Sequence, residues 1–270
     1  MAMKAYRDRA FNERGITEPE LIVCTTAHAA FDKAACYFRI KLVQLVPDPD
    51  TMQLTPASVK KAITPNTVAI VVSAPTFPHG VVDPVPEIGA IAHAAGVGLH
   101  VDCCLGSFMI PFAAELGHSI PVFDFRVPGV TSISADTHKY GFAPKGSSVI
   151  MFRDSALRHH MYYVTTNWTG GIYASPTITG SRSGALVAST WAALMILGKQ
   201  GYREAAKKEL ATASSLRASI ASTPGLKVVG DSKLTIVSFA VDEKSTIGQS
   251  LNIYSVRFLP WKIIFVAAIF

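Results

Sequence analysis

Two segments of the 270-residue sequence end in residue types that could do chemistry. Residues 99–102 form an apolar run that finishes on a carboxylate, Asp102. Residues 132–139 run from an apolar stretch through a polar turn to His138 and Lys139. A lysine amine can hold an aldehyde as an imine, and a carboxylate can keep a pyridine nitrogen protonated. This pair of groups is what the chemistry of pyridoxal 5'-phosphate (PLP) requires.

Each of these residues also has an ordinary role elsewhere in proteins. A single aspartate at a strand end often caps a helix or forms a surface ion pair, and a His-Lys pair is often part of a solvated loop. PLP chemistry is indicated because the aspartate and the His-Lys pair occur together, in this order, at the ends of predicted strands. A cationic ring and His138 near Lys139 would disfavour a second positive charge, so we expect a lowered pKa for Lys139.

Strand and helix patterns alternate along the chain. The β-branched run at residues 68–72 is typical of a strand buried on both faces, and Thr55 followed by Pro56 is a helix start. This alternation predicts a mainly parallel sheet with helices on both faces, where ligands gather at the carboxyl ends of strands. The predicted strands are 21–24, 40–46, 68–72, 97–101, 130–134, 147–152, 226–229 and 234–241, and the predicted helices include 31–38, 84–95, 184–197 and 202–222.

Composition narrows the class of protein. The net charge of +6 is spread along the chain without a basic run, so we expect no nucleic-acid partner. No apolar stretch reaches the roughly 18–20 residues that span a bilayer, so we expect no transmembrane segment. Residues 1–9 resemble a helix rather than a signal peptide. The four cysteines, none in a C-x-x-C pair, are interpreted as reduced thiols that fill the core.

Longer motifs give a family resemblance. They are residues 26–34 (TAHAAFDKA), 100–102 (HVD), 134–141 (SADTHKYG), 143–146 (APKG) and 173–184 (YASPTITGSRSG). Together they resemble the sphingosine-1-phosphate lyases, within the group II PLP-dependent decarboxylase-like family, over about residues 1–241. The resemblance implies an α/β fold: a PLP-dependent transferase-like (aspartate aminotransferase fold type I) large domain with a mainly parallel sheet, and an incomplete C-terminal small domain.

The resemblance also assigns roles around the cofactor, pyridoxal 5'-phosphate. Lys139 would form the imine, and Asp102 would pair with the pyridine nitrogen. His28 would stack on the ring, although a polar residue at a helix start is the alternative. His138 would contact the cofactor phosphate or assist proton transfer. Ser73 and Thr76 would line the cofactor pocket, and no metal is implied.

Other implied roles concern the substrate and a second subunit. Lys145 would lie near the substrate phosphate, with an exposed loop charge as the alternative. Gly180 and Ser181 would reach the cofactor phosphate of a neighbouring subunit, which implies a homodimer with shared active sites. The family location is the endoplasmic reticulum membrane. We expect this chain to lack a membrane anchor and to lie in the cytosol.

The implied reaction is carbon–carbon cleavage of a phosphorylated sphingoid base. Sphinganine or sphingosine 1-phosphate would give phosphoethanolamine and a long-chain aldehyde, as in an aldehyde-lyase of sphingolipid catabolism. A group II amino-acid decarboxylase is the alternative enzyme. Lys145 together with residues 180–182 favours the phosphorylated sphingoid base over an amino acid.

The sequence departs from the family at both ends. A Gly-Thr-rich phosphate loop should precede the first helix, and without its backbone N–H groups we expect weaker PLP binding. We therefore expect a truncated chain, and a catalytically dead fragment that pairs with a full-length subunit is a further alternative. The expected domains are residues 1–210 (PLP-binding), 211–256 (start of the small domain) and 257–270 (an aberrant apolar tail).

Overall fold

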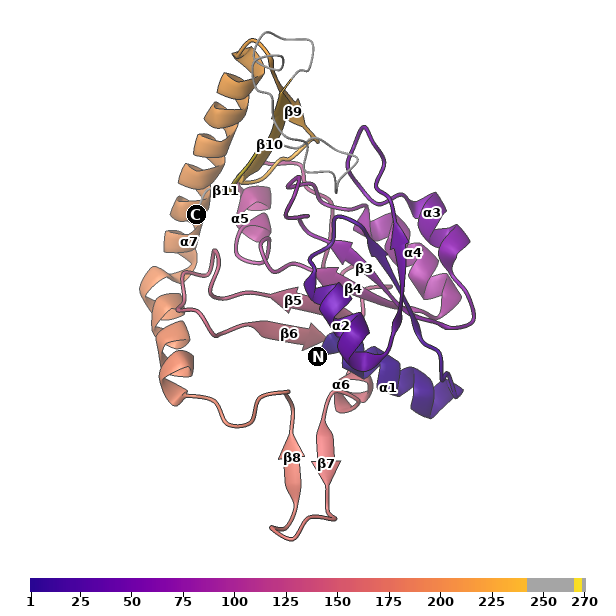
Figure 1. Ribbon diagram of the computed structural model, residues 1–270. Coiled ribbons are helices and arrows are strands. Elements are labelled where there is room, and N and C mark those ends of the chain that lie inside the picture. The colour runs from indigo at the N-terminus through magenta and orange to yellow at the C-terminus, as the bar shows by residue number, and fades with distance from the viewer. Residues whose placement is uncertain (242–264, 269–270) are drawn as a thin grey trace.

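The computed structural model describes residues 1–241 and 265–268. Its centre is a six-stranded sheet in the order β2-β1-β3-β4-β5-β6 (Figure 1). Neighbouring strands are parallel except for β6, which runs antiparallel to β5. The prediction of a mainly parallel sheet is thus confirmed. The strands are β1 (Glu20–Cys24), β2 (Lys41–Leu45), β3 (Thr67–Ser73), β4 (Gly98–Asp102), β5 (Ser132–Ala135) and β6 (Val149–Phe152).

Helices cover both faces of this sheet because side chains of a strand alternate between the faces. In β1, Leu21 and Val23 pack in one buried cluster with α1 and α2. Ile22 and Cys24 belong to the other cluster, which includes residues of α4 and α5. This arrangement confirms the predicted layers. The helices are α1 (Ala2–Arg14), α2 (Ala30–Phe38), α3 (Pro56–Ala62), α4 (Val85–Ala95), α5 (Ile110–Glu115) and α6 (Ser155–His159).

Tyr6 attaches α1 to the middle of the sheet. Its buried hydroxyl lies 2.6 Å from Ser132 Oγ and 2.7 Å from Thr131 Oγ1. Ser132 Oγ also lies 2.7 Å from His100 Nδ1 on the neighbouring strand. A polar chain therefore links α1, β5 and β4 inside an otherwise apolar layer, and its members satisfy one another's hydrogen bonds.

The long helix α7 (Gly184–Ser222) contains a break. Gly198 has φ 55° and ψ −174°, a left-handed value that glycine adopts without a side-chain clash. The sequence predicted two helical patterns, 184–197 and 202–222, and the structure confirms them on either side of this residue. The second half packs against the body through buried residues such as Tyr202 and Leu210.

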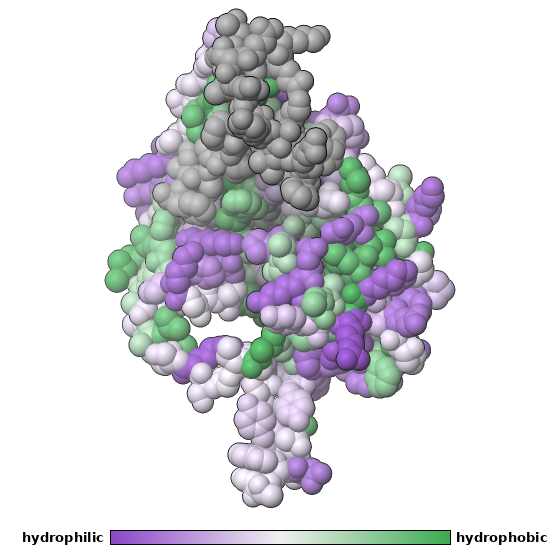
Figure 2. All heavy atoms as spheres, viewed as in Figure 1, coloured by the Kyte–Doolittle hydropathy of each residue, from purple (hydrophilic) through white to green (hydrophobic). Residues whose placement is uncertain are grey.

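Sequence patterns missed the short helix α5 and the hairpin of β7 (Tyr163–Thr165) and β8 (Tyr173–Ser175). The strands of the hairpin are three residues long, too short for a clear alternation of side chains. The hairpin stands away from the rest of the molecule (Figures 1 and 2). We call the hairpin and the first half of α7 the apolar arm (residues 163–175 and 184–197).

The apolar arm exposes large hydrophobic side chains. Ile196 is 83% exposed, Ile172 76% and Trp191 64%. A run of such residues on one segment is unusual for a surface that faces only water, because isolated exposed apolar residues are the normal pattern. The other strongly exposed members are Tyr163, Val164, Trp168, Val187 and Met195.

A second sheet follows α7. It consists of β9 (Leu226–Val229), β10 (Ile236–Val241) and β11 (Phe265–Ala268), all antiparallel in the order β11-β10-β9. Part of the predicted apolar tail, β11, thus pairs with β10, whereas residues 257–264 and 269–270 lie outside the described residues. The predicted domain limits stay a prediction. None of the described helices is long and apolar enough to cross a bilayer.

Candidate active site

Asp102 occupies the carboxyl end of β4, beside the end of β5. The two strands are in register, with Asp102 opposite Ser134. Ser134 Oγ donates a hydrogen bond to Asp102 Oδ1 at 2.8 Å, and the backbone N–H of Cys104 donates to the same oxygen at 3.2 Å. The side chain is held by two donors, one on β5 and one just after β4, so the direction of the carboxylate is fixed before any ligand arrives.

Lys139 lies in the turn that follows β5. Its Nζ is 3.1 Å from Asp136 Oδ2 in an ion pair with little exposure, 21% for the lysine and 14% for the aspartate. The Cys104 thiol also contacts the lysine through a hydrogen bond. Asp136 is itself held, because Ser148 Oγ donates to its Oδ1 at 2.5 Å.

The expectation of a lowered pKa for Lys139 is wrong for this arrangement. Burial lowers the pKa, but hydrogen bonds to Cys104 and Asp136, together with the negative charge of Asp136, outweigh burial, and the pKa is raised from its usual value. Burial beside Asp102 raises the pKa of the Cys104 thiol to about 12, so this thiol is neutral at neutral pH. The charge that acts on Lys139 at neutral pH is therefore the Asp136 carboxylate.

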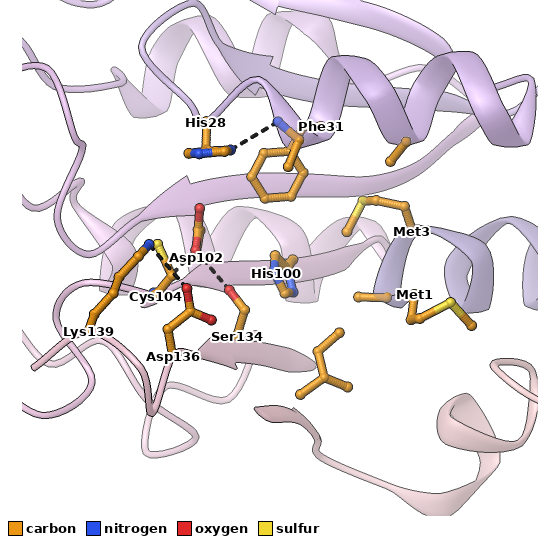
Figure 3. Close-up of a pocket in the computed structure, with 14 residues that line it drawn as sticks. Met1, Met3, His28, Phe31, His100, Asp102, Cys104, Ser134, Asp136 and Lys139 are labelled. Carbon is orange, nitrogen blue, oxygen red and sulfur yellow. Dashed lines mark hydrogen bonds and ion pairs between the residues drawn. The ribbon is translucent and has the colours of Figure 1, made fainter. Parts of the chain in front are cut away.

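Two adjoining cavities open at these strand ends. One has a volume of about 250 Å³ and the other about 170 Å³. Both are lined by His28, Asp102, Cys104 and Lys139. Figure 3 shows these side chains around the larger cavity, which also meets residues 1–3 at the amino end of α1. The structure therefore brings together four of the sequence-predicted site residues: His28, Asp102 and Lys139 at both cavities, and Ser73 at the smaller one.

His28 makes the helix-start contact that the sequence left as its alternative role, and its stacking on the cofactor ring stays a prediction. Its Nδ1 accepts a hydrogen bond from the backbone N–H of Ala30 at 3.0 Å, at the start of α2. This bond makes Nδ1 the acceptor and places the imidazole proton on Nε2. The same ring lines both cavities. The helix-start contact thus orients a ring at the cavity wall.

His100 is a wall residue that sequence reasoning did not single out. It is buried, lines the larger cavity and contacts Phe31 edge-on with ring centroids 5.8 Å apart. Burial lowers the pKa of His100 to about 4, so the ring is neutral at neutral pH. Its position two residues before Asp102 in a strand places both side chains on one face, which was the available signal.

The remaining predicted site residues take varied positions. Ser73 is buried at the end of β3 and lines the smaller cavity. Thr76 is buried and lines neither cavity, and its hydroxyl has no hydrogen-bond partner among the described residues. His138 Nδ1 donates to the backbone oxygen of Ser147, and the ring lines neither cavity.

Three further predicted residues are exposed and line neither cavity: Lys145, Gly180 and Ser181. Their proposed contacts are with a substrate and a second subunit. The roles of these three residues stay predictions.

The cysteines are all free, as the sequence indicated. Cys24 and Cys103 are buried in the core, but Cys36 is exposed and Cys104 forms part of the cavity wall. The interpretation of all four as core fillers is therefore wrong for these last two. Cys104 follows the strand end directly, where side chains leave the core for the ligand edge of the sheet.

The groups around the cavities fit PLP. An amine at Lys139 can hold an aldehyde, a fixed carboxylate at Asp102 can face a pyridine nitrogen, and the His28 ring can cover a flat aromatic face. The amine and the carboxylate come from adjacent strand ends of a mainly parallel sheet. This combination of fold and donor set defines the class: PLP-dependent enzymes of fold type I.

Comparison with known proteins gives the family within this class. Residues 1–242 match the pyridoxal-dependent decarboxylase conserved domain, and the chain belongs to this family. It is similar to the sphingosine-1-phosphate lyase of Dictyostelium discoideum, with 48% identity over 90% of this chain and 46% of that protein. The sphingosine-1-phosphate lyase of Saccharomyces cerevisiae is 49% identical over 91% of this chain and 41% of that protein. The chain thus spans less than half the length of these relatives.

Comparison with solved structures supports the same fold. The sphingosine-1-phosphate lyase of Burkholderia pseudomallei superposes with a TM-score of 0.87 and 48% identity, over 89% of this chain and 55% of that one. The glutamate decarboxylase of Lactobacillus brevis superposes with a TM-score of 0.75 and 25% identity, over 89% of this chain and 56% of that one. The resemblance to sphingosine-1-phosphate lyases and the fold that it implied are confirmed.

Proposed function

We propose that this chain is the PLP-binding part of a carbon–carbon lyase that acts on phosphorylated sphingoid bases. Its products would be phosphoethanolamine and a long-chain aldehyde. The observation that carries the proposal is the cavity shared by Lys139, Asp102 and His28 in a chain 48% identical to a sphingosine-1-phosphate lyase. That relative extends well beyond the matched part, which covers 46% of its length.

Three residues would hold the cofactor. Lys139 would bind it covalently through Nζ, Asp102 would face the pyridine nitrogen, and His28 would lie against the ring. When bound, PLP supplies a conjugated system that accepts the electron pair of the broken carbon–carbon bond. The amino end of α1 reaches the same cavity, and a helix amino end favours an anionic group such as a phosphate.

The main contribution of this chain would be to keep a proton on the pyridine nitrogen. Asp102 is 8% exposed, and Ser134 and the Cys104 N–H already hold its Oδ1. A carboxylate with little water around it interacts strongly with a cationic N–H, and its fixed direction needs no reorganisation during the reaction. Asp102 would thereby hold the proton at that nitrogen while the carbon–carbon bond breaks.

Substrate selection would lie at the exposed end of the site. Lys145 is exposed in the loop after the Lys139 turn, so its ammonium is available to a phosphate that approaches from solvent. We propose that it binds the substrate phosphate. His138 would support the same turn or assist proton transfer, and Ser73 and Thr76 would contribute to the cofactor pocket.

A second subunit is part of this proposal. The apolar arm exposes Trp191, Ile196 and Ile172, and a second copy of the chain would cover such a surface. Gly180 and Ser181 lie between the hairpin and α7, where they would reach the cofactor of the partner subunit. A location at the endoplasmic reticulum membrane for the whole protein rests on the family resemblance alone.

An amino-acid decarboxylase is the second candidate. The superposition on Lactobacillus brevis glutamate decarboxylase, with a TM-score of 0.75, favours it, as does the description of the matched family. Against it stands the higher identity, 48%, to the Burkholderia pseudomallei lyase. A third candidate is an inactive fragment that only pairs with a full-length subunit.

Product analysis separates the three candidates. The chain would be incubated with PLP and sphinganine 1-phosphate, and the released aldehyde and phosphoethanolamine would be measured. We expect both products, with a higher KM for Lys145→Ala than for the control Lys61→Ala, because only Lys145 would bind the phosphate. Carbon dioxide from glutamate instead would support the decarboxylase. Absence of products from both substrates would leave the inactive fragment.

A further inference from the structure

Asp136 has a set of contacts that none of the roles above uses. Its Oδ2 lies 3.1 Å from Lys139 Nζ and 3.7 Å from His138 Nε2. Its Oδ1 accepts a hydrogen bond from Ser148 Oγ at 2.5 Å. The side chain also lines the larger cavity. A carboxylate held in this way at the lysine of the site is more than a surface charge.

We propose that Asp136 is a positioning residue that holds Lys139 in its ammonium form, beside the cavity, whenever the lysine amine is free. The pair is separated by two residues of one turn, so the turn itself keeps the charges together. The low exposure of both side chains reduces screening by water and strengthens the attraction.

The other groups that face Lys139 form no second ion pair with it. Cys104, from the end of β4, also raises the pKa of Lys139 through its hydrogen bond, but its thiol is neutral at neutral pH because burial raises its own pKa to about 12. Asp102 lines the same cavities, but its Oδ1 is already held by Ser134 and by the Cys104 N–H. His28, before α2, and His138, in the same turn, add no negative charge. Among the described residues, Asp136 is the carboxylate in ion-pair contact with Lys139.

The consequence for the reaction rests on the proposed function. A lysine displaced from the cofactor would take up a proton and stay beside Asp136. Its lone pair is then used in an N–H bond, so it cannot attack carbon. The ammonium would instead be a proton donor at the cavity: it would give its proton to a basic atom of the bound substrate, the electron pair of the broken N–H bond would return to nitrogen, and the neutral amine could act as a nucleophile again.

The test is the pH dependence of Lys139 labelling without PLP. Trace acetic anhydride would label the full chain over a range of pH, and the extent at each lysine would be read by peptide mass spectrometry. In the unmodified chain, Lys139 should reach half-labelling at higher pH than the exposed Lys60, an internal reference on α3. In Asp136→Asn the Lys139 curve should move to lower pH. Labelling at neutral pH should rise about tenfold if the curve moves by one pH unit.

Two variants and one reference make the test decisive. Asp124→Asn removes a carboxylate that pairs with Arg126 elsewhere, and it should leave the Lys139 curve unchanged. Asp136→Glu keeps the charge and should keep the higher half-labelling pH. An unshifted Lys139 curve in Asp136→Asn would overturn the proposal. If that variant does not fold, a Lys139 curve at or below the Lys60 curve in the unmodified chain would overturn it equally.

Failure of this inference differs from failure of the proposed function. The labelling is done without PLP or substrate, so it reports only the charge of Lys139. A chain that forms no aldehyde from sphinganine 1-phosphate but shows the expected labelling curves would refute the lyase and leave the role of Asp136 intact. Product formation together with unshifted labelling curves would support the lyase and refute the role of Asp136.

Discussion

The strand-end site and the apolar arm differ in whether their side chains have partners among the described residues. At the strand ends, Asp102, Asp136 and Lys139 each have a partner within the chain. In the apolar arm, large side chains such as Trp191 and Ile196 lie exposed. The difference indicates that contacts among the described residues orient the chemical groups, whereas no described residue covers the arm, which we propose a second copy of the chain covers. Substitutions on each side of this comparison should therefore act through different measurable properties.

The largest effect is expected at the strand-end site. Asp102→Asn keeps the shape of the side chain but removes the negative charge that we propose lies opposite the pyridine nitrogen. Loss of one preorganised electrostatic contact typically costs about 100-fold or more in rate. We expect at least that loss in kcat for aldehyde release, with Asp50→Asn in an exposed turn as the control. A variant with unchanged kcat would show that Asp102 does not face the cofactor.

The apolar arm should respond through assembly. Trp191→Arg would place a charge in the proposed interface with a second copy. Truncation of one central aromatic residue typically costs about 2 kcal/mol of binding, roughly 30-fold in the dissociation constant. Sedimentation velocity over a concentration series would measure the shift. The control is Phe11→Arg, because Phe11 is similarly exposed but lies on α1. Equal association in both variants would remove the arm from the interface.

A smaller effect is expected where α1 attaches to the sheet. Tyr6→Phe removes the hydroxyl that contacts Ser132 and Thr131. Ser132 keeps its contact with His100, and Thr131 keeps its bonds to Leu99, so no group loses all its partners. The free energy of unfolding should fall by about 1 kcal/mol. Urea denaturation would measure it, and a change near zero would show that this polar chain does not stabilise the site.

The smallest effect concerns the second half of α7. Burial raises the pKa of Glu209 to about 7, and its Oε2 has no hydrogen-bond partner among the described residues. An acid whose pKa is raised by folding binds protons more tightly in the folded state. Its contribution to stability is therefore full below its unfolded pKa and is lost as pH rises through about 7.

The matched variant is Glu209→Gln, which cannot titrate. The unmodified chain should lose stability relative to this variant between mildly acidic and mildly alkaline pH. Thermal unfolding over that range would measure the difference. A constant difference in melting temperature across the range would show that Glu209 does not titrate in the folded chain.

Local patterns in the sequence predicted most of the fold. The β-branched run that became β3 and the Thr55 cap of α3 identified their elements because both signals are local. The hairpin of β7 and β8 was missed because strands of three residues are too short to show an alternation of apolar and polar side chains. The break at Gly198 was visible as a gap between two helical patterns.

The residues of the candidate site that belong to recognisable motifs could be predicted from the sequence. Asp102, Lys139 and His28 were found from strand ends and from the family resemblance. Cys104 and Asp136 were not given roles, because their importance depends on which atoms approach Lys139 in space. The direction of the Lys139 pKa was wrong for the same reason: the sequence shows the neighbouring His138, but not the ion pair with Asp136.

The central claim is that Lys139 binds PLP, and covalent trapping tests it most directly. The chain would be mixed with PLP and reduced with borohydride, and the modified lysine would be located by peptide mass spectrometry, with absorbance near the visible edge followed in parallel. We expect modification at Lys139 in the unmodified chain and in the control Lys145→Ala, and loss of the absorbance in Lys139→Ala. Equal absorbance in Lys139→Ala, or trapping spread over exposed lysines without Lys139, would contradict the account.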